Sequence, residues 1–180
     1  GGVTATSPNY PITGYVIKKF NNPMDAWTGT GARHIQKAYP IIRYAEILLS
    51  YAEAINNLTG IHTVEVGGQR YTVSRDKEEI KKAFNLVRYR AGLPGLTDTQ
   101  LESVSEVQKQ IERERMVEFL WENRRYYDVR RWGIYEETEQ EPIRGMNPDG
   151  ATKETYYQRV IPSSSSFLTR VVDKRSVWVP

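Results

Sequence analysis

Residues 111–133, IERERMVEFLWENRRYYDVRRWG, place glutamates and arginines directly among large apolar side chains. Helix geometry, at about 100° per residue, puts two of the glutamates on an apolar stripe. The stripe comprises Val107, Ile111, Glu114, Glu118 and Trp121. Desolvating a lone carboxylate is costly, so both glutamates need cationic partners if the stripe packs against other helices. Arginine suits this task because its planar fork offers two parallel hydrogen bonds to one carboxylate.

The arginines that can supply these partners lie both inside the stretch and earlier in the chain. The candidates are Arg115, Arg125, Arg130 and Arg131, with Arg43 or Arg88 approaching from earlier helices. We therefore predict a structural ion network that locks the helices in one arrangement. Its predicted members are Arg43, Glu46, Arg88, Glu114, Arg115, Glu118, Arg125, Asp128 and Arg131. Removing one member of a buried pair is expected to cost about 3–5 kcal/mol.

The first strong helical pattern follows Pro40 and predicts a helix over residues 41–58. Its apolar stripe is formed by Tyr44, Ile47, Leu48, Tyr51, Ile55 and Leu58. The opposite stripe is polar and is formed by Arg43, Glu46, Ser50, Glu53 and Asn57. Taken by itself, the polar stripe is most simply a solvated helix face.

Two long helices and a short one are predicted after this first helix. One starts at Asp76, where Glu79 can complete a capping box, and stops at Gly92 and Pro94. The next starts at Ser103 and ends at Asn123, a residue that tolerates a left-handed cap. The short helix covers residues 125–132 and stops at Gly133. The C-terminal end of the helix from Ser103 is expected to be buried on most sides, because apolar residues surround its axis: Met116, Val117, Phe119, Leu120 and Trp121.

A small β-hairpin is predicted over residues 62–73, inserted between the first two helices. Two β-prone runs flank Gly67-Gly68, and such a turn needs positive φ at both central residues. The fold class predicted is mainly α, with tetratricopeptide-like helix pairs, this hairpin and long irregular loops. The remaining expectations are a strand over 15–20, a turn at 147–150, a turn-like loop at 163–166, extended segments at 171–172 and 177–179, and irregular chain at 1–14 and 21–39.

Composition excludes several kinds of site. The 180 residues contain no cysteine and two histidines, His34 and His62, so neither thiolate nor imidazole chemistry is expected, nor a metal or a cofactor. The net charge of +3 is a weak excess, which argues against a nucleic-acid partner. No apolar run approaches the roughly 20 residues of a membrane-spanning helix. The 12 tyrosines and 4 tryptophans suit half-hydrated surfaces, including those that bind sugars.

Two other functions are weighed for the charged stretch. Glu114 and Glu118 are one helical turn apart, and together they are candidates for a glycosidase dyad. Neighbouring arginines would lower both pKa values, whereas a general acid needs one raised. The run from Arg124 to Trp132 combines arginines with aromatics, as single-stranded nucleic-acid sites do. Asp128 interrupts that run and acids precede it, so the structural network is preferred to both alternatives.

Three ordered motifs resemble the C-terminal region of the SusD/RagB family. The motifs are 111–133, quoted above, PIIRYAEILLSYAEA over 40–54, and NLVRYRAGLP over 85–94. Residues 177–180, VWVP, resemble the start of a closing segment of that family. Asn123 stands where the family has a capping glycine, and Phe119 and Val129 replace leucines, all mild departures. The resemblance covers most of residues 1–180, which we expect to be one C-terminal region of a longer protein.

The resemblance implies a non-enzymatic protein that binds an oligosaccharide or a similar nutrient. It implies docking on a SusC-type TonB-dependent transporter at the cell surface. It also implies outer-membrane anchoring through an N-terminal lipid. Residues 1–10, GGVTATSPNY, do not have the basic and apolar pattern of a signal peptide. The tetratricopeptide-like helix pairs are likewise part of this implied fold.

Ligand-binding candidates within the chain are aromatic residues in the predicted loops. Trp27 lies beside Asp25 and Thr28, and Tyr156-Tyr157 lie in the late loop. An exposed ring with nearby hydrogen-bonding groups is what a sugar-binding surface needs. Rings that pack over helix ends would look the same in sequence. A scaffold without a ligand of its own and a glycoside hydrolase are the competing functions.

Overall fold

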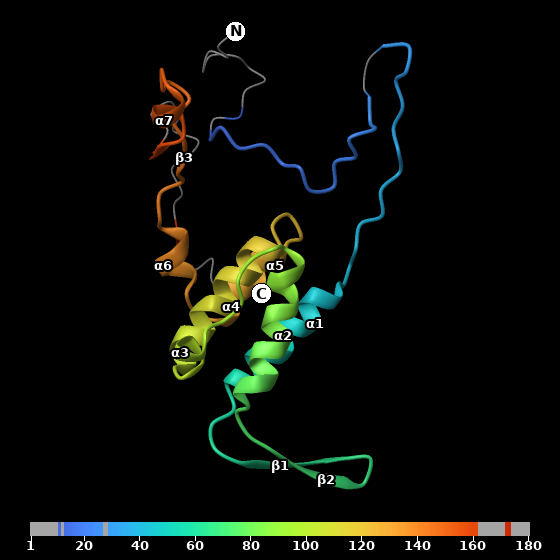
Figure 1. The fold of residues 1–180 in the computed structure, drawn as a ribbon, viewed down its shortest axis with the longest axis vertical. Helices are drawn as coiled ribbons and strands as arrows, with labels where there is room; N and C mark the ends of the chain where they lie inside the picture. Colours follow the sequence, from blue (N-terminus) through green and yellow to red (C-terminus); the bar gives the residue numbers. More distant parts are fainter. Residues whose placement is uncertain (1–10, 12, 27–28, 162–171, 174–180) are drawn as a thin grey trace. The chain divides into compact units, whose positions relative to one another are not determined.

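The computed structural model describes residues 11, 13–26, 29–161 and 172–173 and is mainly α-helical, as predicted (Figure 1). These residues divide into two compact units. Tyr39–Asp128 forms the first, here called the helical unit. The described residues within Gly1–Ala38 and Val129–Pro180 form the second, here called the loop-rich unit.

Helix α1 (Tyr44–Asn56) falls within the predicted range, but the prediction of its buried face is wrong. Tyr44, Ile47 and Tyr51 of the apolar stripe are exposed, Tyr44 to 71%. The helix instead buries Leu49, Ala52, Glu53 and Asn56. Leu48 and Ile55 lie at the edge of this face and pack against the core.

Asn56, a polar residue on the buried face of α1, can be buried because groups from distant segments complete its hydrogen bonds. The Asn56 amide is fully buried; its Nδ2 donates to the carbonyl oxygen of Val104 at 3.0 Å. The guanidinium of Arg75 donates twice to Asn56 Oδ1, at 3.1 and 2.9 Å. A buried polar group whose hydrogen bonds are satisfied carries little net penalty. The small side chain of Ala52, between these polar groups, leaves room for close helix approach.

The hairpin prediction is confirmed. Strands β1 (His62–Val66) and β2 (Gln69–Val73) pair antiparallel, with Val66 opposite Gln69. Gly67 and Gly68 have φ values of 60° and 79°, which residues with a Cβ adopt only at a cost. Figure 1 shows the hairpin projecting away from the helices of its unit, and nearly all of its residues are exposed.

Helix α2 (Lys77–Arg90) begins where its capping signal predicts. Asp76 Oδ1 accepts hydrogen bonds from the backbone N–H groups of Glu78 and Glu79, at 2.9 and 3.0 Å. The helix ends before Gly92, whose φ is 70°. A one-turn helix that the sequence did not suggest, α3 (Asp98–Leu101), follows with a capping box between Thr97 and Gln100.

Helix α4 (Val104–Glu118) starts as predicted, because the Ser103 hydroxyl accepts from the Glu106 N–H at 3.2 Å. Its predicted end at Asn123 is wrong. The chain leaves the helix after Glu118, and both Trp121 and Asn123 have left-handed φ values, 65° and 59°. Helix α5 (Arg124–Arg131) then starts within one residue of the predicted short helix.

The predicted burial around the end of α4 is also wrong. Only Phe119 of the five apolar residues there is buried. Those exposed are Met116, Val117, Leu120 and Trp121. The turn after Glu118 accounts for Trp121, because a straight helix would have carried that residue onto the buried stripe of Val107 and Ile111. Met116 and Val117 lie within α4 itself, on its exposed side.

The core of the helical unit lies between α1, α2 and α4, which lie side by side in Figure 1. Its buried members are Leu49, Ala52, Ile80, Ala83, Phe84, Val87, Leu96, Leu101, Val107, Ile111 and Phe119. Alanines from α1 and α2 contribute to this contact, as expected for closely packed helices.

The loop-rich unit is mostly irregular, as expected. It contains α6 (Tyr135–Glu139), β3 (Gly145–Met146), α7 (Lys153–Tyr156) and β4 (Arg159–Val160), with β3 and β4 antiparallel. The predicted strand over 15–20 does not form, whereas the turn at 147–150 closes with a 3.1 Å hydrogen bond. In the predicted extended segment 171–172, Val172 is not in a strand and residue 171 lies outside the described residues. The extended segment predicted over 177–179 and the turn-like loop predicted over 163–166 also lie outside the described residues.

Candidate functional site

Arg43, at the N-cap of α1, joins that helix to the end of α4. Its Nη1 donates to Glu118 Oε1 at 2.7 Å, and its Nη2 donates to the Glu118 carbonyl oxygen at 3.0 Å. Nε and Nη2 donate to the two carboxylate oxygens of Glu122, both at 2.8 Å. Hydrogen bonding to Glu122, and then to Glu118, raises the pKa of Arg43. This guanidinium therefore fixes the turn after α4 against the start of α1.

Two arginines from the end of α2 reach the glutamates of α4. Arg88 Nη1 donates to Glu114 Oε2 at 2.9 Å, and Arg88 Nε donates to the Pro94 carbonyl oxygen at 2.9 Å. Arg90 Nη2 donates to Glu118 Oε2 at 2.5 Å. Glu118 is thus shared by α1 and α2, and its side chain is only 10% exposed.

Arg115 and Asp128 form the most deeply buried ion pair described, with both side chains 5% exposed. Nε donates to Oδ2 at 2.8 Å and Nη2 to Oδ1 at 3.1 Å, a bidentate geometry. Nη1 donates to the Ser50 hydroxyl at 3.2 Å. This one guanidinium therefore connects α4, α5 and α1.

The same region contains an aromatic ring between two guanidiniums. The guanidinium carbons of Arg43 and Arg115 lie 5.2 and 5.1 Å from the centroid of the Phe119 ring. Contacts at this distance are favourable cation–π interactions. Phe119 is buried, so its ring contacts both guanidiniums while it packs in the core.

Of the other predicted network members, Glu46 binds Arg124, 2.9 Å away. Arg125 lies half-buried on α5. Arg131 is exposed, with its guanidinium carbon 4.4 Å from the Trp132 ring centroid. The predicted members therefore form several separate groups of contacts, not a single cluster.

Four participants were not predicted: Glu122, Arg90, Arg124 and Ser50. Glu122 follows Glu118 by four residues, the spacing of one helical turn, and this was the available signal in the sequence. Nothing local marks Ser50, because its partner Arg115 is 65 residues away in the chain.

Of the ligand-binding candidates, Tyr156 and Tyr157 belong to the loop-rich unit. Trp27 lies outside the described residues. Tyr156 and Tyr157 form an edge-to-face pair with centroids 5.3 Å apart. Tyr156 is half-buried, and Tyr157, which follows the last residue of α7, is 62% exposed. The Tyr157 ring therefore presents an accessible aromatic surface.

Neither a metal-binding cluster nor a membrane-spanning helix is found in the described part of the chain. No group of three or more histidines, cysteines, aspartates or glutamates there has an arrangement that can hold a metal ion. Within the same residues, every helix is too short or too polar to cross a membrane.

This chain is similar to known proteins in sequence and in fold. A family model described as the SusD family matches residues 1–180. A crystal structure of a SusD-like protein from Bacteroides fragilis NCTC 9343 is 32% identical in sequence, with a TM-score of 0.51. The matched part covers 76% of this chain and 21% of that chain, so this chain spans about a fifth of the length of that relative. No curated protein matches the sequence.

The family model and the crystal structure agree with the resemblance seen in the three motifs. The match extends over all residues of the sequence, including those between the motifs. The helices that carry the motifs are α1, α2, α4 and α5, which share the arginine–carboxylate contacts described above. The chain belongs to the SusD family.

Proposed function

We propose that this chain is part of a non-enzymatic, surface-exposed protein that binds an oligosaccharide or similar nutrient. The proposal includes delivery of that ligand to a SusC-type TonB-dependent transporter and attachment to the outer membrane through an N-terminal lipid. The observation that carries it is the SusD family match over residues 1–180. The long irregular segments of the loop-rich unit and the exposed Tyr157 ring support a binding role.

The arginine–carboxylate contacts favour architecture over catalysis. Glu114 and Glu118, the residues of the alternative glycosidase dyad, accept hydrogen bonds from Arg88, Arg43 and Arg90. A glycosidase needs two carboxyl groups that contact the sugar, whereas these two are engaged by arginines from other segments of the chain. The network joins four helices and accounts for these acids without substrate.

Incubating the intact protein with a panel of neutral oligosaccharides distinguishes the three functions. Retention of a glycan without cleavage supports the proposal. Release of shorter products would identify a hydrolase and overturn it. Absence of both binding and cleavage over the whole panel would favour the scaffold without a ligand. Co-purification with a SusC-type transporter and labelling with radioactive palmitate test the partner and the lipid anchor.

Alanine substitutions test the aromatic candidates separately. We propose that Trp27→Ala or Tyr157→Ala lowers glycan affinity without changing the melting temperature, because each removes a ring that can stack on a sugar. Tyr71→Ala is the matched control, since this exposed tyrosine lies on the hairpin of the other unit. Unchanged binding in a variant removes that residue from the proposed site.

A further inference from the structure

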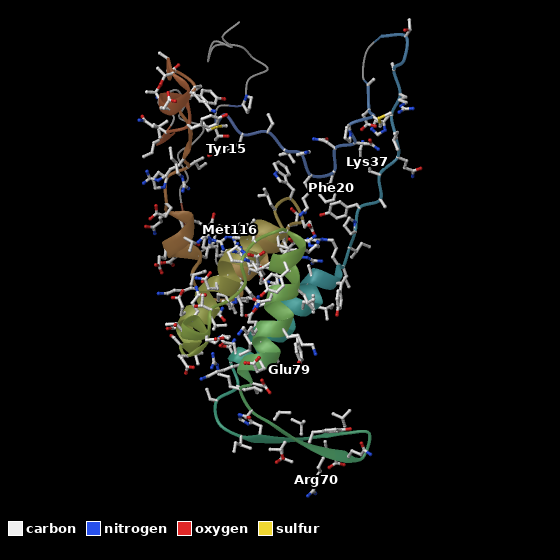
Figure 2. All side chains as sticks on the ribbon, viewed as in Figure 1. Tyr15, Phe20, Lys37, Arg70, Glu79 and Met116 are labelled. Atoms are coloured by element: carbon white, nitrogen blue, oxygen red, sulfur yellow. The ribbon has the colours of Figure 1, made fainter. Side chains whose placement is uncertain are left out.

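A groove in the helical unit is lined by both apolar and polar side chains. It has a volume of about 300 Å³ and lies between the second half of α1, the end of β2 and the first turn of α2. Figure 2 shows Glu79, one of its lining residues, at the end of α2 nearest the hairpin. This volume matches the lower end of small-molecule sites, about 300 Å³.

The apolar part of the groove consists of half-buried aliphatic side chains and one aromatic ring. Ile55, Leu58 and Val73 are the aliphatic members. Tyr51 is 47% exposed, even though it belongs to the stripe predicted to be buried. A pyranose ring has an apolar C–H face, and an aromatic ring is the side chain that best covers such a face.

The polar part of the groove is rich in hydrogen-bond acceptors. Asp76 and Glu79 contribute carboxylates, while Thr72 and Ser74 contribute hydroxyls. The Tyr51 hydroxyl donates to Glu79 Oε2 at 3.3 Å, so the aromatic ring and one carboxylate are positioned together. Hydroxyl-rich ligands donate hydrogen bonds to groups of this kind.

Two features reduce the negative charge of the site. Asp76 caps α2, so its carboxylate lies at the positive end of the helix dipole. Glu79 has Lys82 Nζ at 3.8 Å. A cationic ligand therefore gains little here, and a neutral ligand with several hydroxyls fits better. Among the described residues, the hydrogen bonds that Asp76 accepts fall on Oδ1, and Oδ2 can still accept.

We propose that this groove binds one residue of a neutral saccharide, with the Tyr51 ring against its apolar face and Asp76 and Glu79 accepting from its hydroxyls. The inference rests on the proposed glycan-binding function and assigns part of it to a site in the helical unit. The inserted hairpin supplies one wall through Thr72 and Val73. This site is distinct from the aromatic candidates of the loop-rich unit.

The test compares variants of the intact protein by calorimetry with maltose, cellobiose, mannobiose and xylobiose, followed by their longer homologues. Tyr51→Ala is expected to weaken binding about tenfold, whereas Tyr51→Phe, which keeps the ring, is expected to bind within about threefold of the parent. Tyr44→Ala is the matched control, because Tyr44 is an exposed tyrosine on α1 that does not line this groove.

Substitutions of the two acids provide a second readout that preserves folding. Asp76→Asn keeps a good N-cap residue, and Glu79→Gln keeps an acceptor for Tyr51. Each is expected to weaken binding about five- to tenfold, because a hydrogen bond to a charged carboxylate becomes a weaker one to a neutral amide. Glu78→Gln changes an acid in the same helical turn that does not line the groove, and it should bind like the parent.

The outcomes separate this site from the proposed function as a whole. Loss of affinity in the Tyr51 and acid variants, with the controls unchanged, supports the site. Glycan binding that is equally strong in the parent, Tyr51→Ala and Asp76→Asn overturns the site and leaves the proposed function standing. Failure of the parent to bind any glycan overturns both.

Discussion

Replacing Arg115 by methionine tests how strongly the buried ion pair holds the helices together. Methionine retains much of the apolar length of the arginine side chain but removes its charge and its donors. The structure predicts the loss of two hydrogen bonds to Asp128, one to Ser50 and the cation–π contact with Phe119. The substitution leaves the buried Asp128 carboxylate without its guanidinium.

The expected loss in the free energy of unfolding is about 3–5 kcal/mol, the range for removing one partner of a buried pair. Both side chains are 5% exposed, so water cannot take over the solvation of Asp128. An exposed pair contributes only about 0.2–1 kcal/mol by comparison. The double variant Arg115→Met, Asp128→Leu removes both charges and should lie within about 2 kcal/mol of the parent. Large coupling between the two positions is therefore the specific signature of the pair.

Urea unfolding followed by far-UV circular dichroism measures these free energies, with the m-value as a check that the unfolded state is unchanged. The control is Arg70→Met on the hairpin, where Arg70 and Glu65 are 3.8 Å apart with side chains 80% and 61% exposed. Its effect should stay below about 0.5 kcal/mol. Equal midpoints for Arg115→Met and Arg70→Met, or additive effects in the double variant, would refute the assignment of Arg115 as a buried structural partner.

Three further tests address a surface charge, a tight contact and a helix cap. Hydrogen bonding from Lys81 lowers the pKa of Asp98 in the folded protein. The stabilisation from this pair is therefore present above the ordinary pKa of 3.8 and is lost as pH falls through the lower folded pKa. NMR titration of Lys81→Met should show the pKa of Asp98 return to its ordinary value. Gly95→Ala should destabilise by about 1–3 kcal/mol, because a Cβ there would lie 2.3 Å from Asn85 Oδ1, and normal urea stability would contradict this. Asp76→Ala should cost about 1 kcal/mol in thermal unfolding while Asp76→Asn is nearly neutral, and equal losses in both would argue against capping.

Local chemistry made several elements predictable from sequence. Asp76 and Ser103 mark helix starts because each side chain accepts a hydrogen bond from an N–H group two or three residues away. Gly67 and Gly68 define the hairpin turn because the required φ values are positive. The partners in each case are near neighbours in the chain, so no knowledge of the tertiary structure was needed.

The arginine–carboxylate contacts were predictable in kind but not in pairing. Glutamates on an apolar stripe require cations, and that physical need is visible in the sequence of residues 111–133. Which arginine meets which acid is decided by helix packing: Arg43 reaches Glu118 across 75 residues, and Arg88 reaches Glu114 across 26. Arg115, predicted as a possible partner for the glutamates, instead binds Asp128.

The sequence alone predicted a helix over residues 41–58 with one apolar and one polar stripe, and indicated that acids and arginines would have to pair. Only the tertiary structure decided that α1 buries the polar residues Glu53 and Asn56, while Tyr44, Ile47 and Tyr51 of the apolar stripe face outward. Periodicity shows that a helix has distinct faces, but burial depends on what covers them. Here distant segments bring partners to the polar residues of α1 and its N-cap: Arg75 to Asn56, Arg115 to Ser50, Arg124 to Glu46 and Glu122 to Arg43. For the buried Asn56, these hydrogen bonds offset the cost of removing a polar group from water.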